Sequence, residues 1–119
     1  MSRTGTRPTI DAVPNIRCMS VALTPEQEAA CRNAIMPIPI VRAAHVAEAS
    51  SSMSTVLPLI VIIDEKMPKA DRDAMAEFIM ACGAEVVALD PSLVGKGLAK
   101  RLLDAIVIAE RRRMGAPGL

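Results

Sequence analysis

The stretch Leu59-Ile60-Val61-Ile62-Ile63-Asp64 decides the fold of this chain. It is an unbroken run of aliphatic side chains, without the polar alternation of a strand that has one face in water. Such a run predicts a central strand of a parallel sheet, covered by helices on both faces. The full chain of 119 residues leaves room for one domain of this kind.

Segments typical of strands and helices alternate on both sides of this run. The other predicted strands are residues 16–23, 38–43 and 85–89. The predicted helices are residues 24–36, 46–55, 71–82 and 98–113. Alternation of strands and helices with short connections predicts an α/β fold, in which a central parallel sheet of about four strands lies between helices.

Two of the helix ends carry specific signals. In Thr24-Pro25-Glu26-Gln27 we expect Thr24 to cap the helix, Pro25 to occupy its first position and Gln27 to return the capping bond. Gly83 follows the helix at 71–82 and suits the left-handed residue that ends many helices.

The composition excludes several classes of protein. Hydrophobic residues make up 51% of the chain, which is enough for a core. A net charge of +1 and an aromatic content of 1% argue against a nucleic-acid binder, which needs a basic face or stacking side chains. The longest apolar run, residues 56–63, is far shorter than the about 20 residues of a membrane span.

The cysteines and the chain ends complete this picture. The chain has three cysteines without a C-x-x-C pair and a single histidine, His45, so a structural zinc site is excluded and we expect free buried thiols in the cytoplasm. We expect a flexible arm at residues 1–15, the domain at 16–113 and a disordered tail at 114–119.

One segment carries a family resemblance. Ala43 and Ala44 are followed by Pro58, the aliphatic run and Asp64-Glu65-Lys66-Met67-Pro68. This pattern, ending in D-x-x-M-P, resembles the receiver domain of bacterial response regulators. Gly83-Ala84-Glu85 and Asp90-Pro91 resemble the motifs around the last strand of that family. The resemblance implies a flavodoxin-like, receiver-like three-layer fold.

The chain is shorter than the family pattern. Receivers have five strand–helix units, whereas this sequence predicts four strands. Either an internal helix and strand are deleted, or the chain stops before the last pair. The spacing of Gly83-Ala84 and Asp90-Pro91 favours an internal deletion.

The resemblance also assigns a degenerate site. It makes Asp64 the equivalent of the phosphoacceptor, places the Mg²⁺-binding acidic pair at Ala22 and Leu23, and places the family's lysine at Asp90. Ala22 and Leu23 offer no metal ligand. Asp64 and Asp90 would face each other without a cation, which raises a carboxyl pKa and opposes phosphoryl transfer. We therefore expect no metal, no cofactor and no enzymatic activity.

Three other features have ordinary structural explanations. We expect His45 to be a loop residue, because no partner for acid–base chemistry is visible. Gly95-Lys96-Gly97 lacks the spacing of a phosphate-binding loop and predicts a flexible turn. The run from Arg111 to Arg113 is typical of a solvated helix end, where positive charge is favoured by the helix dipole.

These observations lead to a functional hypothesis with two alternatives. We expect a pseudo-receiver, a phosphorylation-independent signalling protein that binds another signalling protein or itself as a homodimer. The candidate contacts lie on the last helix and are Leu98, Leu102, Ala105, Ile106 and Ala109. The alternatives are a true receiver phosphorylated on Asp64 by a histidine kinase in a two-component pathway, and a small-molecule binder at the carboxyl ends of the strands.

Overall fold

A computed structural model describes residues 16–113. The arm predicted at 1–15 and the tail predicted at 114–119 lie outside the described residues. The strands are β1 (Cys18–Val21), β2 (Ile40–Ala43), β3 (Ile60–Asp64) and β4 (Glu85–Leu89). The helices are α2 (Pro25–Ile35), α3 (Val46–Val56), α4 (Lys69–Cys82) and α5 (Gly95–Arg113).

The four strands form one sheet in the order β2-β1-β3-β4, and all neighbouring pairs are parallel. The aliphatic run lies in β3, whose residues Ile60 to Ile63 are almost fully buried. Its register pairs Ser20 with Ile62 on one side and Asp64 with Leu89 on the other. The predicted α/β class with a central four-strand parallel sheet is confirmed.

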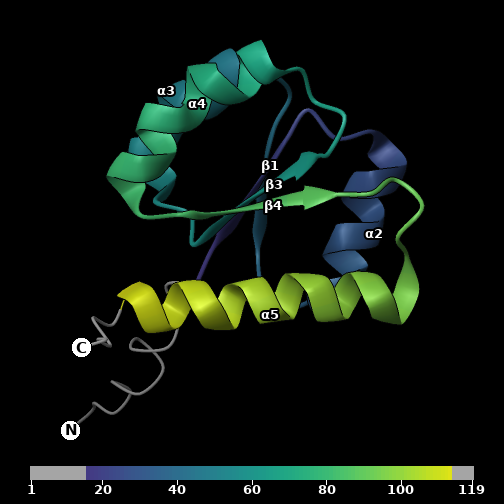
Figure 1. The fold of residues 1–119 in the computed structure, drawn as a ribbon. Helices are drawn as coiled ribbons and strands as arrows, with labels where there is room; N and C mark the ends of the chain where they lie inside the picture. The colour runs from purple at the N-terminus through teal and green to yellow at the C-terminus, as the bar shows by residue number, and fades with distance from the viewer. Residues whose placement is uncertain (1–15, 114–119) are drawn as a thin grey trace, which may run out of the picture.

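Two helices cover each face of the sheet (Figure 1). Helices α2 and α5 pack on one face over a cluster that includes Cys18, Ile60 and Ile62. Helices α3 and α4 pack on the other face over Met19 and Val61. We call these the α2/α5 layer and the α3/α4 layer. The arrangement is a shortened flavodoxin-like three-layer fold.

The predicted signals at the helix ends are present. Thr24 Oγ1 accepts the backbone N–H of Gln27 at 3.1 Å, and Gln27 Oε1 accepts the backbone N–H of Thr24 at 2.9 Å. Gly83 ends α4 with φ 70°, and its N–H donates to the last carbonyls of the helix. Leu57 ends α3 in the same left-handed region at φ 51°, where a side chain is unfavourable.

The prediction about the last helix is wrong in one respect. The residues proposed as partner contacts are at most 4% exposed, because they form the face of α5 that packs on the sheet. They are Leu98, Leu102, Ala105, Ile106 and Ala109. The apolar side chains that α5 does expose are Leu103, Val107 and Ile108.

The glycine segment before this helix also differs from the prediction. Gly95 and Gly97 belong to the first turn of α5 and do not form a separate flexible turn. Gly95 has φ +64°, and a Cβ on Gly97 would approach Leu93 Cδ1 to 3.0 Å, so both positions suit glycine. Over residues 16–113, no helix is both long and apolar enough to cross a membrane.

Candidate functional site

The candidate site lies where the sheet order reverses, between the carboxyl ends of β1 and β3. Strand β1 connects to β2 on one side, and β3 continues to β4 on the other. Ligands of such sheets bind at this point because the strand ends and helix N-termini diverge there. Ser20 pairs with Ile62, so Ala22 and Asp64 lie at the same level at the edge of the sheet.

Both carboxylate oxygens of Asp64 accept hydrogen bonds. The backbone N–H of Lys66 donates to Oδ1 at 2.8 Å, and Nε2 of Gln27 donates to Oδ2 at 2.9 Å. Gln27 therefore uses its amide twice, since its Oε1 completes the cap of α2. Asp64 joins the end of β3 to the first turn of α2, two segments that are 37 residues apart in the chain.

The electrostatics of Asp64 differ from the expectation. The N–H of Lys66 and the amide of Gln27 hold the pKa of the Asp64 carboxyl below its ordinary value, and the Lys66 charge lowers it further. The neighbouring Asp90 charge raises the pKa, but this is the weakest contribution. We expected Asp64 and Asp90 to face each other without a cation. This expectation is wrong, because the Lys66 charge lowers the pKa of both carboxyls.

Asp90 is held by local bonds. Its Oδ1 accepts the backbone N–H of Ser92 at 2.9 Å and the Ser92 hydroxyl at 2.8 Å. These bonds, followed by the Lys66 charge, lower the pKa of the Asp90 carboxyl. Asp90 therefore organises the turn that leads from β4 to α5 and does not form a hydrogen bond with Asp64.

The positions of the expected acidic pair have separate structural roles. Leu23 is buried in the α2/α5 layer. Ala22 is exposed at φ 56°, a left-handed conformation that costs about 1–2 kcal/mol for a residue with a Cβ. Within residues 16–113, no group of three or more His, Cys, Asp or Glu side chains could hold a metal ion.

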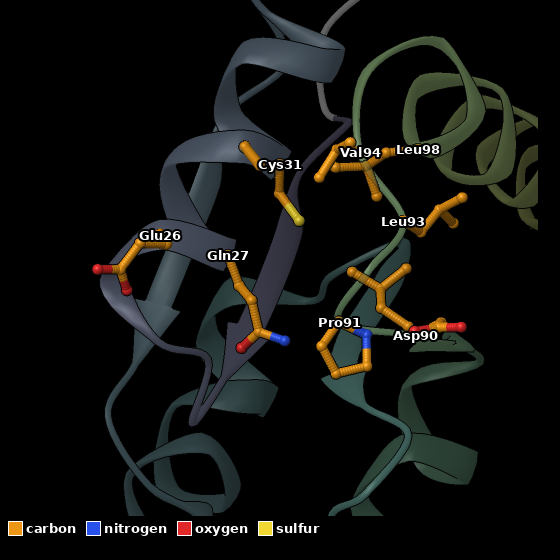
Figure 2. A pocket seen from close by; sticks show the side chains of 10 residues that line it. Glu26, Gln27, Cys31, Asp90, Pro91, Leu93, Val94 and Leu98 are labelled. Atoms are coloured by element: carbon orange, nitrogen blue, oxygen red, sulfur yellow. The ribbon is translucent and has the colours of Figure 1, made fainter.

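A small cavity of about 100 Å³ lies beside Asp90, between α2 and the start of α5. Figure 2 shows Gln27 and Cys31 facing Pro91 and Leu93 across it, while Glu26 points away. Pockets for drug-sized ligands measure roughly 300–1,000 Å³. This cavity is suited to one small apolar group, which leaves the small-molecule alternative without a site of adequate size here.

A buried polar pair joins β1 to α2 and was not predicted. Ser20 in β1 donates its hydroxyl proton to Glu28 Oε1 in α2, and Glu28 pairs with Arg32 at 2.7 Å. Both Ser20 and Glu28 are buried. The sequence signal was a single serine inside the apolar run from residue 18 to residue 21, which alternation alone assigns to the α2/α5 layer.

The cysteine thiols near this pair have little reactivity. Cys18 and Cys31 are free and buried, as predicted, whereas Cys82 is half-buried. Burial, followed by the neighbouring Cys31, raises the pKa of the Cys18 thiol to about 12. Burial and Glu28 raise the pKa of Cys31 to about 11. Thiols with such pKa values supply almost no thiolate at neutral pH.

The remaining predicted features have structural roles. His45 caps α3, because its Nδ1 accepts the N–H of Glu48 at 3.2 Å. Arg112 pairs with Glu85 at 2.8 Å, and Arg113 donates to the carbonyls of Leu57 and Pro58 at 3.4 and 3.3 Å. Part of the arginine run therefore ties the end of α5 to the sheet and to α3, which corrects the expectation of a fully solvated end.

Comparisons with protein-family models, with curated proteins and with solved structures find no match to this chain. The geometry of the residues is therefore the basis for the functional argument.

Proposed function

We propose that this protein is a pseudo-receiver, a signalling protein that acts by binding another protein and does not depend on phosphorylation of Asp64. The observation that carries the proposal is the state of the Asp64 carboxylate. Both of its oxygens already accept hydrogen bonds from Lys66 and Gln27. Each oxygen therefore already has a donor from the chain itself, which reduces what Asp64 can offer to a cation.

The surrounding residues support the same conclusion. Mg²⁺ requires oxygen ligands in near-octahedral geometry, commonly including one or two carboxylates. Ala22 and Leu23 supply none, and Oδ1 of Asp90 accepts two hydrogen bonds from Ser92. Phosphoryl transfer depends on metal and cationic stabilisation of the transferred group. Lys66 is the only positive charge that acts on Asp64 among the described residues, and it acts on Asp90 as well.

The surface supports binding of a protein. Large exposed apolar side chains lie on α4, β4 and α5, and the cavity next to the strand ends is too small for a typical metabolite. Exposed apolar side chains that cluster on neighbouring elements are typical of protein–protein contacts.

Incubation with acetyl phosphate and Mg²⁺, followed by intact-mass measurement, tests the proposal. We expect no phosphoryl adduct on the natural chain and none on Asp64→Asn. Ala22→Asp is the matched gain-of-function control, because it restores one carboxylate at an exposed position level with Asp64. An adduct on the natural chain that disappears in Asp64→Asn would establish the alternative, a receiver phosphorylated on Asp64.

A further inference from the structure

The outer edge of β4 has no covering element among the described residues. Strand β4 pairs only with β3 and ends the sheet. Figure 1 shows its free edge between α4 on one side and α5 on the other. The edge of a strand presents unpaired N–H and C=O groups, and proteins commonly block it with Pro or Lys. The sequence of β4, Glu-Val-Val-Ala-Leu, contains neither, and its one charged residue, Glu85, lies at the first position and pairs with Arg112.

A hollow of about 230 Å³ opens beside this edge, between α4 and the sheet. Its apolar lining consists of Ile63, Met75, Ala76, Ile79 and Val86. Arg72 and Asp73 form its polar rim. The hollow lies in the α3/α4 layer, where α4 leaves the outer part of β4 uncovered.

A projecting side chain lies close to this hollow. Met80 is 79% exposed, more than any other large hydrophobic residue of the described chain. It lies four residues after Ala76 and seven after Asp73, so all three share one flank of α4. The hollow and Met80 are therefore on the same face of the molecule. The side chain of Met80 is unbranched and adaptable, so it could fill such a hollow.

Helix α5 contributes a second contact on the other side of the edge. Ile108 is 50% exposed and lies one turn before Arg112, which pairs with Glu85 at 2.8 Å. Strand residues rise ~3.3 Å each, and helix residues ~1.5 Å each. Since α5 runs back along β4, the centre of the strand at Val87 lies level with Ile108.

We propose that a second copy of this chain pairs with β4 in antiparallel orientation, with its two-fold axis at Val87 and Ile108. The proposal rests on the proposed function as a protein-binding module and names its partner. The two sheets then form one continuous eight-strand sheet. Met80 of each copy enters the hollow of the other, and Ile108 contacts Ile108 of the second copy.

Charge and size favour a second copy as the occupant. Within one copy, Asp104 pairs with Lys100 and Arg112 pairs with Glu85, both at 2.8 Å. Asp104 and Arg112 lie one turn on either side of Ile108, so the two-fold axis brings each Asp104 next to Arg112 of the second copy and joins these pairs into one network of alternating charge. The face is ~28 Å long along the 19 residues of α5. With a helix layer on each side of the strand, each copy would bury on the order of 600 Å², which is near the lower limit for a stable dimer.

Sedimentation velocity from micromolar to millimolar concentration tests this pairing. We expect a dimer, and we expect Met80→Glu and Ile108→Asp each to raise its Kd about tenfold or more. Both side chains are exposed, so the fold should be retained, which circular dichroism verifies. Met36→Glu is the matched control, because Met36 is 68% exposed at the end of α2, away from the β4 edge.

Crosslinking locates the axis. Under oxidised glutathione, Ile108→Cys should form a disulfide-linked dimer. Leu103→Cys should not, because Leu103 lies one turn after Ala99, which is on the α2 flank of the same helix. The natural chain controls for Cys82. The pairing is overturned if the chain is a monomer at all concentrations. It is also overturned if a dimer forms and neither Met80→Glu nor Ile108→Asp changes its Kd. A phosphoryl adduct on Asp64 overturns the proposed function instead, whatever the oligomeric state.

Discussion

The two helical layers cover the same sheet to different extents. In the α2/α5 layer, α5 spans 19 residues and lies along β4, and the cavity of about 100 Å³ lies away from the β4 edge, between α2 and the start of α5. In the α3/α4 layer, α3 and α4 span 11 and 14 residues, and a hollow of about 230 Å³ remains at the edge. At the β4 edge the α2/α5 layer is therefore closed and the α3/α4 layer is open, and we call them the closed layer and the open layer. The open layer has apolar surface at this edge that is available for a partner.

The largest expected effect comes from matched truncations in the two layers. Ile106 in α5 is 4% exposed, and Ile79 in α4 is 9% exposed beside the hollow. Ile106→Ala should lower the free energy of unfolding by about 3–4 kcal/mol, and Ile79→Ala by about 2 kcal/mol, since the second change enlarges a space that water already reaches. Urea denaturation measures both. Equal losses would show that the two layers are packed equally well.

The buried polar pair sharpens the comparison, because it belongs to the closed layer alone. Ser20→Ala leaves one oxygen of Glu28 without its hydroxyl donor inside the core. We expect a loss of about 2 kcal/mol, the usual cost of an unsatisfied buried polar group. Ser20→Ala combined with Glu28→Met should recover part of this loss, because both polar groups are then gone. A larger loss in the double variant would contradict this explanation.

Local sequence signals predicted the parts of this structure that depend on local interactions. The aliphatic run at 59–63 indicated the central strand, and Thr24-Pro25-Glu26-Gln27 indicated the capping box. The hydrogen bond from Gln27 to Asp64 could not be predicted, because the two residues are brought together only when the chain has formed the sheet. The apolar face of α5 was assigned to a partner, whereas it packs on the sheet. Periodicity defines an apolar face but does not show what covers it.

Both layers share the carboxyl edge of the sheet, and a substitution there should have a smaller effect on the free energy of unfolding. Asp64→Asn weakens the tie between β3 and α2 and should cost about 1 kcal/mol, a modest amount because the group is partly exposed. The folded-state pKa of Asp64 is lowered, so its contribution is present above the unfolded pKa of about 3.9 and is lost as the pH falls. The natural chain should therefore lose more stability than Asp64→Asn on acidification below about pH 4.

Asp90→Asn is the control for this experiment. The Asp90 carboxylate accepts its hydrogen bonds from Ser92, two residues away, and such a local turn can also form in the unfolded chain. The effect on the denaturation midpoint should be smaller than that of Asp64→Asn. If the two variants were equally destabilised, the link from Asp64 to α2 would contribute nothing beyond a local turn.

The smallest effect should be an increase in the free energy of unfolding, and it concerns the two helices of the open layer. Its two helices end in the same left-handed conformation, but α4 ends at Gly83 and α3 ends at Leu57. Leu57 is exposed, so removing its side chain costs little burial while relieving the unfavourable contact of its Cβ. Leu57→Gly should raise the free energy of unfolding by up to about 1 kcal/mol, whereas Gly83→Ala should lower it by a similar amount. If Leu57→Gly were destabilising, the side chain of Leu57 would contribute packing that outweighs its backbone strain, and the open layer would be better closed at this end than its exposure indicates.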